Sequence, residues 1–151
     1  MSKAEKVILT NMCMVCYGNK VLVQDRINSN WKGLTFPGGH VEKLESFTAA
    51  VIREVKEETG LTIFSPQLCG IKQWQEKEDV RYIVLFYKTD KFEGELKSSD
   101  EGDVFWMERD EFLNSRLAPD MAQMFDIFVN DDKSEFYYFL DKDGKWDYEI
   151  K

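Results

Sequence analysis

The stretch GGHVEKLESFTAAVIREVKEETGL, residues 38–61, carries the strongest pattern in this sequence. Val51 and Val55 are spaced four residues apart, which places both on one face of a helix. Gly60 follows in the position where a left-handed residue commonly ends a helix. These signals predict a helix over residues 46–59 whose apolar face packs on a sheet.

The same helix has a second, acidic face. Residues three and four apart are neighbours on a helix surface, so Glu54, Glu57 and Glu58 crowd together. Each like-charge pair costs about 0.2–0.5 kcal/mol when nothing lies between the charges. The face is therefore either a solvated surface that tolerates this cost or a site for a cation. An all-oxygen site beside a glycine-rich turn suits Mg²⁺ or Mn²⁺, whereas zinc is disfavoured because His40 is the only imidazole.

The spacing of the charged residues and glycines resembles the Nudix box at every specified position. The fixed residues are Gly39, Glu45, Arg53, Glu54, Glu57, Glu58 and Gly60, with aliphatic residues at Val55 and Leu61. The resemblance covers residues 39–61. It implies an α+β fold in which a mixed β-sheet is sandwiched between helices, with residues 1–151 forming a single domain.

The resemblance also implies an enzyme that hydrolyses a phosphoanhydride bond with a divalent metal, Mg²⁺ or, in its place, Mn²⁺. Carried over residue by residue, Glu54, Glu57 and Glu58 would bind the metal with the carbonyl of Gly39. Arg53 and Glu45, about two helical turns apart, would brace the helix, and they count with Glu54 and Glu57 as catalytic residues.

Two residues outside the box match further parts of the resemblance. Glu101, in an acidic loop with Asp100 and Asp103, is the expected additional metal ligand because a Glu-Gly pair before Trp106 resembles the MutT-type arrangement. Arg26 stands where similar enzymes place a phosphate-contacting arginine. Solvated surface charges are the alternative interpretation of both residues.

The short chain and the segment LTFPGGHVE, residues 34–42, resemble enzymes that act on an oxidised purine nucleotide such as 8-oxo-dGTP. Such enzymes cleave it to the monophosphate and pyrophosphate. Gly38, Trp74 and Asp120 are the expected substrate-binding residues, and His40 is expected only to shape the loop. Structural roles, a helix cap for Asp120 and a core position for Trp74, remain open. The alternatives are hydrolysis of ADP-ribose or a dinucleoside polyphosphate, or a non-catalytic nucleotide-binding regulatory module.

Composition limits the remaining function classes. The chain has 151 residues, 43% of them hydrophobic, and a net charge of −8, which disfavours nucleic-acid and membrane-surface binding. Three cysteines without an export signal indicate a reducing cytoplasm. Cys13 and Cys16 are predicted to point to opposite faces of one strand, as buried thiols. A monomer and a homodimer are both compatible with the sequence.

The remaining elements follow from turn signals and alternation. Strands are expected over residues 6–16, 21–26, 67–75, 80–89 and 104–108, two short helices over 109–117 and 119–130, and a terminal hairpin over about 134–150. Pro119 suits the first turn of the last helix.

Overall fold

The computed structural model describes residues 3–27 and 30–151 of the chain. The elements, in chain order, are β1 (Lys6–Tyr17), β2 (Lys20–Arg26), β3 (Gly33–Thr35), α1 (Phe47–Thr59), β4 (Thr62–Ile63), β5 (Gln67–Lys77), β6 (Val80–Thr89), β7 (Phe92–Glu93), β8 (Gly102–Glu108), α2 (Arg109–Leu113), α3 (Met121–Val129), β9 (Glu135–Leu140) and β10 (Trp146–Ile150).

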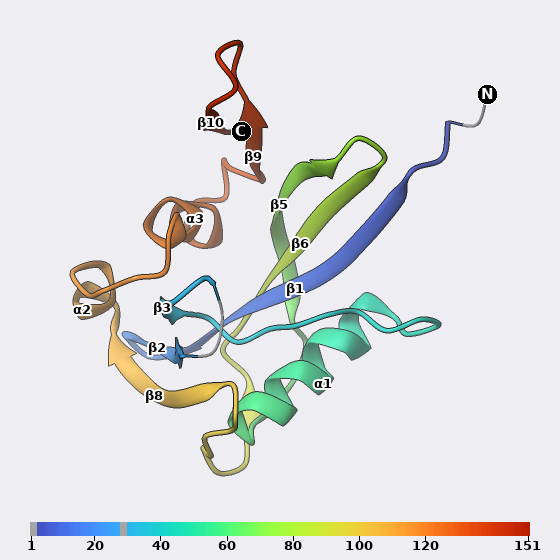
Figure 1. Ribbon diagram of the computed structural model, residues 1–151. Helices are drawn as coiled ribbons and strands as arrows, with labels where there is room; N and C mark the ends of the chain where they lie inside the picture. The colour runs from blue at the N-terminus through green and yellow to red at the C-terminus, as the bar shows by residue number, and fades with distance from the viewer. Residues whose placement is uncertain (1–2, 28–29) are drawn as a thin grey trace.

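The main sheet is mixed. Its strands lie in the order β10-β9-β5-β6-β1-β2-β3, with β8 also paired to β2, and β4 and β7 form a separate pair. The β1–β6 and β5–β9 pairs are parallel, and the other pairs are antiparallel. Helix α1 lies on one side of this sheet, and α2 and α3 lie on the other (Figure 1). The predicted α+β sandwich is confirmed.

Two hydrophobic clusters hold the layers together, one on each face of the sheet. Alternation along β1 sends Cys13 into the cluster beneath α1, while Met14 and the half-buried Cys16 join the cluster beneath α2 and α3. The predicted opposite orientation of the two cysteines is therefore confirmed, and both are free thiols.

Helix α1 has the predicted apolar face and the predicted end. Val51 and Val55 are completely buried against the sheet. The Ser46 hydroxyl accepts a 3.0 Å hydrogen bond from the Ala49 N–H, which caps the first turn. Gly60 has φ 80°, and its N–H donates to the Lys56 carbonyl. Both ends of the helix are thus fixed by residues within or directly beside it.

The two short helices are shorter than expected. Helix α2 ends at Leu113, because the following segment runs beside β3: the Leu34 N–H donates to the Arg116 carbonyl and the Ala118 N–H donates to the Leu34 carbonyl, each at 3.0 Å. Helix α3 begins at Met121, so the placement of Pro119 in its first turn is wrong.

The C-terminal hairpin is confirmed and extends the main sheet. Strand β9 pairs in parallel with β5, and β10 forms the outer edge. Asp141 closes the turn by accepting hydrogen bonds from the N–H groups of Asp143 and Lys145. No helix in the described part of the chain is long and apolar enough to cross a membrane.

Candidate active site

The loop that enters α1 lies tightly between β1 and the helix. The Gly39 carbonyl accepts a 2.8 Å hydrogen bond from the Asn11 N–H, and the Gly39 N–H donates to the Asn11 side-chain oxygen at 3.1 Å. A Cβ atom added at Gly39 would stand 2.3 Å from the carboxyl carbon of Glu54, and one at Gly38 would stand 2.0 Å from the Asn11 carbonyl oxygen. Gly38 therefore requires glycine because the backbone of β1 approaches it closely, whereas a side chain at Gly39 would displace the Glu54 carboxyl.

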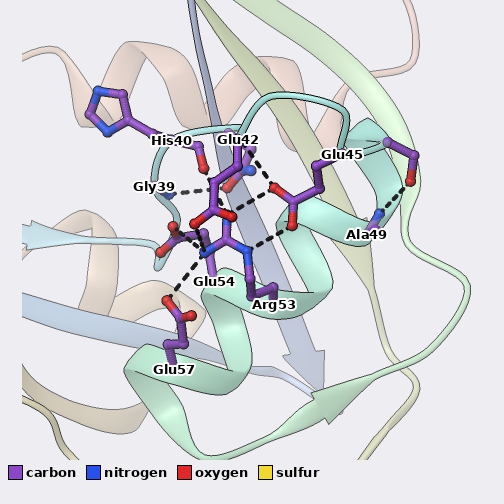
Figure 2. Close-up of polar contacts among 10 residues, drawn as sticks. Gly39, His40, Glu42, Glu45, Ala49, Arg53, Glu54 and Glu57 are labelled. Atoms are coloured by element: carbon purple, nitrogen blue, oxygen red, sulfur yellow. Dashed lines mark hydrogen bonds and ion pairs between the residues drawn. The ribbon is translucent and has the colours of Figure 1, made fainter.

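Arg53 organises this loop and the acidic face of α1 (Figure 2). Its Nε and Nη2 donate to the two carboxylate oxygens of Glu45 at 2.7 and 2.9 Å, a bidentate pair. Nη2 also donates to the His40 carbonyl at 3.0 Å, whereas the His40 side chain is exposed. Nη1 donates to Glu54 at 2.9 Å and to Glu57 at 3.2 Å. The predicted Glu45–Arg53 brace is confirmed as a contact, and His40 contributes through its backbone.

The carboxyl groups around Arg53 sit in different electrostatic surroundings. The hydrogen bonds from Arg53 lower the pKa of Glu45 to about 2. Burial raises the pKa of Glu54, although Arg53 partly opposes this effect. Burial also raises the pKa of Glu58 to about 7, despite the hydrogen bond that its Oε2 accepts from the Gly38 N–H at 2.9 Å. The Glu57 side chain is 58% exposed.

Arg26 and Glu101 lie outside the box, the first before it in the sequence and the second after it. Arg26 ends β2 and Glu101 directly precedes β8, and these strands pair with Arg26 opposite Gly102. The Arg26 Nη2 lies 3.8 Å from a carboxylate oxygen of Glu101. The charges of both residues act on Glu58, Arg26 lowering its pKa and Glu101 raising it. The structure thus brings both residues predicted outside the box to the acidic helix.

The donor set fits a hard divalent cation. Within residues 3–27 and 30–151 no three carboxylate, imidazole or thiol groups already stand in a metal-binding arrangement. The available donors are nonetheless all oxygen, and the missing side chain at Gly39 lets the Glu54 carboxyl lie against the loop. The Gly39 carbonyl is engaged by Asn11, whereas the described residues place no hydrogen bond on the Gly38 carbonyl. Gly38 therefore offers the freer backbone oxygen.

Asp120 and Trp74 lie together at a different place, on the α3 side of the sheet. Asp120 is the N-cap residue of α3, with φ 65°, but its side chain makes no capping hydrogen bond. Its carboxylate lies 4.0 Å from the Lys72 ammonium. Trp74 is half-buried rather than in the core: it stacks on Tyr82 with ring centroids 4.4 Å apart, and its indole N–H donates to Glu76 at 2.7 Å.

Lys72 is the residue of this second cluster that the sequence analysis missed. Its ammonium lies 5.1 to 5.5 Å from the ring centroids of Trp74, Phe136 and Tyr138. Burial lowers its pKa, which the charge of Asp120 opposes. The available signal was its position two residues before Trp74 on one strand, which places both on one face of the sheet.

Comparison with known proteins agrees with this geometry. The profile of the family described as the NUDIX domain matches residues 9–128. An ADP-ribose pyrophosphatase from Methanocaldococcus jannaschii is 33% identical over 106 residues, covering 69% of this chain and 60% of that protein. An uncharacterised Nudix hydrolase from Bacillus subtilis is 29% identical over 122 residues, covering 78% of this chain and 76% of that protein.

Solved structures extend the likeness to nearly the whole chain. The crystal structure of a mutator MutT protein from Bacillus halodurans superposes with a TM-score of 0.79 at 28% identity, covering 95% of this chain and 97% of that one. The box residues, their arrangement around Arg53 and the family match over residues 9–128 lead to one conclusion. The chain belongs to the Nudix family and is a pyrophosphohydrolase.

Proposed function

We propose that the enzyme hydrolyses a phosphoanhydride bond of a nucleoside di- or triphosphate derivative with the help of Mg²⁺, which Mn²⁺ can replace. The proposed substrate is 8-oxo-dGTP or a related nucleoside triphosphate, with the monophosphate and pyrophosphate as products. The observation that carries the proposal is the acidic face of α1, on which one guanidinium contacts Glu45, Glu54 and Glu57 together.

The proposed metal ligands are Glu54, Glu57, Glu58, Glu101 and the backbone carbonyl of Gly39 or Gly38. When bound, the divalent ion offsets the phosphate charge and activates water for attack. The protein residues supply positioning: Arg53 orients Glu54 and Glu57, and the Gly38 N–H orients Glu58. Glu54 and Glu57 are the proposed catalytic carboxylates of the helix, and Glu54, Glu57 or Glu101 accepts the proton from water.

Arg26 is the proposed phosphate-binding residue. Its guanidinium lies at the same edge of the sheet as Glu101, and the Arg26 side chain keeps 25% of its surface exposed. A guanidinium in this position can donate to a phosphate oxygen while the carboxylates face the cation. Arg26 would thus contact the phosphates, and the carboxylates would hold the cation.

The proposed base subsite is the cluster of Lys72, Trp74 and Asp120. The Trp74 ring, which stacks on Tyr82, supplies an aromatic wall, the Asp120 carboxylate accepts hydrogen bonds from a base edge, and the Lys72 ammonium donates them. Adjacent donor and acceptor groups suit the edge of guanine, which presents O6 beside N1–H. The alternative substrate is ADP-ribose, which the similarity to the ADP-ribose pyrophosphatase described above supports.

Two variants test the reaction. Glu57→Gln should abolish turnover with Mg²⁺ while circular dichroism and the melting temperature stay unchanged, because the exposed side chain is a ligand rather than a core residue. Glu42→Gln is the matched control, since the Glu42 carboxylate also lies near Arg53, at 3.8 Å, but outside the fixed box positions. Full activity of Glu57→Gln would refute its assignment as a catalytic metal ligand. A calorimetric titration that detects no binding of Mg²⁺ or Mn²⁺ would refute it too.

The substrate is tested by product analysis on 8-oxo-dGTP, the ordinary dNTPs, ADP-ribose and a dinucleoside tetraphosphate. Release of 8-oxo-dGMP and pyrophosphate is expected, with a raised KM and little change in kcat for Asp120→Asn and Lys72→Met. Preferential cleavage of ADP-ribose or the dinucleotide would keep the reaction and overturn the nucleotide choice. Equal KM values for wild type and both variants would overturn the base subsite.

A further inference from the structure

A cavity of about 390 Å³ lies on the face of the sheet opposite the acidic helix. It is lined by the ends of β1, β6 and α3 and by Arg109, the first residue of α2. Asn11 of β1 contacts the loop that enters α1, whereas Cys16 of the same strand lines the cavity. Five residues of extended strand separate them by about 17 Å, so the cavity is distinct from the proposed active site.

Arg109 is the unusual residue of this cavity. Its Nε is buried and has no hydrogen-bond partner in the structure as described, and its Nη2 has only a 3.9 Å contact with the Cys16 sulfur. No carboxylate lies within 4.0 Å of its guanidinium among residues 3–27 and 30–151. The centroid of the Phe125 ring lies 6.0 Å from the central carbon of the guanidinium. A guanidinium without a carboxylate partner favours an anion supplied from outside.

The other lining groups give the cavity two chemically different walls. Lys88 adds a second cation, and its ammonium donates to the Phe128 carbonyl at 3.2 Å. Met14 and Phe128 form an apolar wall, and Asp90 is the one carboxylate among the lining residues. The Lys88 ammonium also lies 3.6 Å from the Asp131 carboxylate, so Arg109 is the lining cation that has no carboxylate within 4.0 Å among residues 3–27 and 30–151.

We propose that this cavity is a second ligand site, which binds a small molecule through an oxyanion, a phosphate or a carboxylate. Arg109 and Lys88 hold the oxyanion, and the apolar remainder of the ligand packs on Met14 and Phe128. The planar guanidinium can present its two Nη groups to two oxygens of one anion. The volume lies within the range of about 300–1,000 Å³ that is common for small-molecule sites.

Titration of the metal-free, full-length protein with inorganic phosphate tests the proposal. Methionine methyl groups labelled with ¹³C report the cavity and the proposed base subsite by different signals, because Met14 lines the cavity and Met121 directly follows Asp120. Ionic strength is held constant with sodium chloride. Saturable movement of the Met14 signal is expected, and Arg109→Met should weaken the apparent affinity at least tenfold.

Further variants distinguish the outcomes. Asp90→Asn should tighten binding a few-fold because it removes the carboxylate from the lining, and Arg109→Met should leave hydrolysis by the enzyme unchanged. Parallel titration with acetate distinguishes a carboxylate site from a phosphate site. Movement of Met121 alone, no Met14 movement with either anion, or equal affinity in wild type and Arg109→Met would overturn the proposal. If Arg109→Met unfolds, Arg109→Lys provides the same comparison of affinities with wild type. It keeps the positive charge but loses the paired N–H donors of the guanidinium.

Discussion

Glu58 provides the sharpest test of how the acidic helix is built. Burial raises the pKa of this carboxyl to about 7 from its ordinary value of 4.5. The folded protein therefore holds the Glu58 proton more tightly than the unfolded chain does. The protonated group contributes stability that is complete below about pH 4.5 and is lost as the pH rises through 7.

The magnitude follows from the two pKa values. A difference of about 2.5, at 1.36 kcal/mol for each tenfold change, corresponds to about 3 kcal/mol of stability lost by pH 8. Glu58→Gln removes this loss, because its amide does not ionise and its side-chain oxygen can still accept the hydrogen bond from the Gly38 N–H. For a chain of this size the gain corresponds to a melting temperature roughly 6–12 °C higher at pH 8.

The assay is urea unfolding of wild type and Glu58→Gln in EDTA at pH 4.5, 6, 7 and 8. The two proteins should have similar free energies of unfolding at pH 4.5, and the variant should become about 3 kcal/mol more stable than wild type at pH 8. Glu57→Gln, at an exposed position, is the control and should show little such gain. A Glu58→Gln variant no more stable than wild type at pH 8 would refute the reasoning.

Three further predictions concern neighbouring features. Arg53→Lys should lower kcat about 10–100-fold with a lower melting temperature, because an ammonium cannot reproduce the forked contacts of the guanidinium; equal kcat values would contradict it. Gly39→Ala should weaken Mg²⁺ binding measured by calorimetry, because the new methyl group displaces the Glu54 carboxyl, whereas Gly144→Ala, in an open turn, should not. Gln24→Leu should raise the free energy of unfolding by about 1–3 kcal/mol, since both polar atoms of this completely buried side chain lack partners; a destabilised variant would show that the amide is satisfied.

The sequence by itself determined the helix and its brace. The limits of α1, its apolar face at Val51 and Val55, and the pairing of Glu45 with Arg53 all follow from contacts within the box or beside it. Such contacts depend on helical periodicity and end signals, which a short stretch of sequence contains in full. The mixed fold also followed, because the box identified the family and strand signals surrounded it.

Only the tertiary structure decided which distant residues meet. The Arg26–Glu101 contact joins residues from two strands, and Lys72 meets Asp120 only because β5 passes the start of α3. The early end of α2 has the same origin, since its continuation pairs with Leu34 instead of extending the helix. Pairings across the sheet depend on how the whole chain packs, so local propensity does not predict them. The acidic face could therefore be predicted from the sequence, whereas the residues that complete the site around it required the fold.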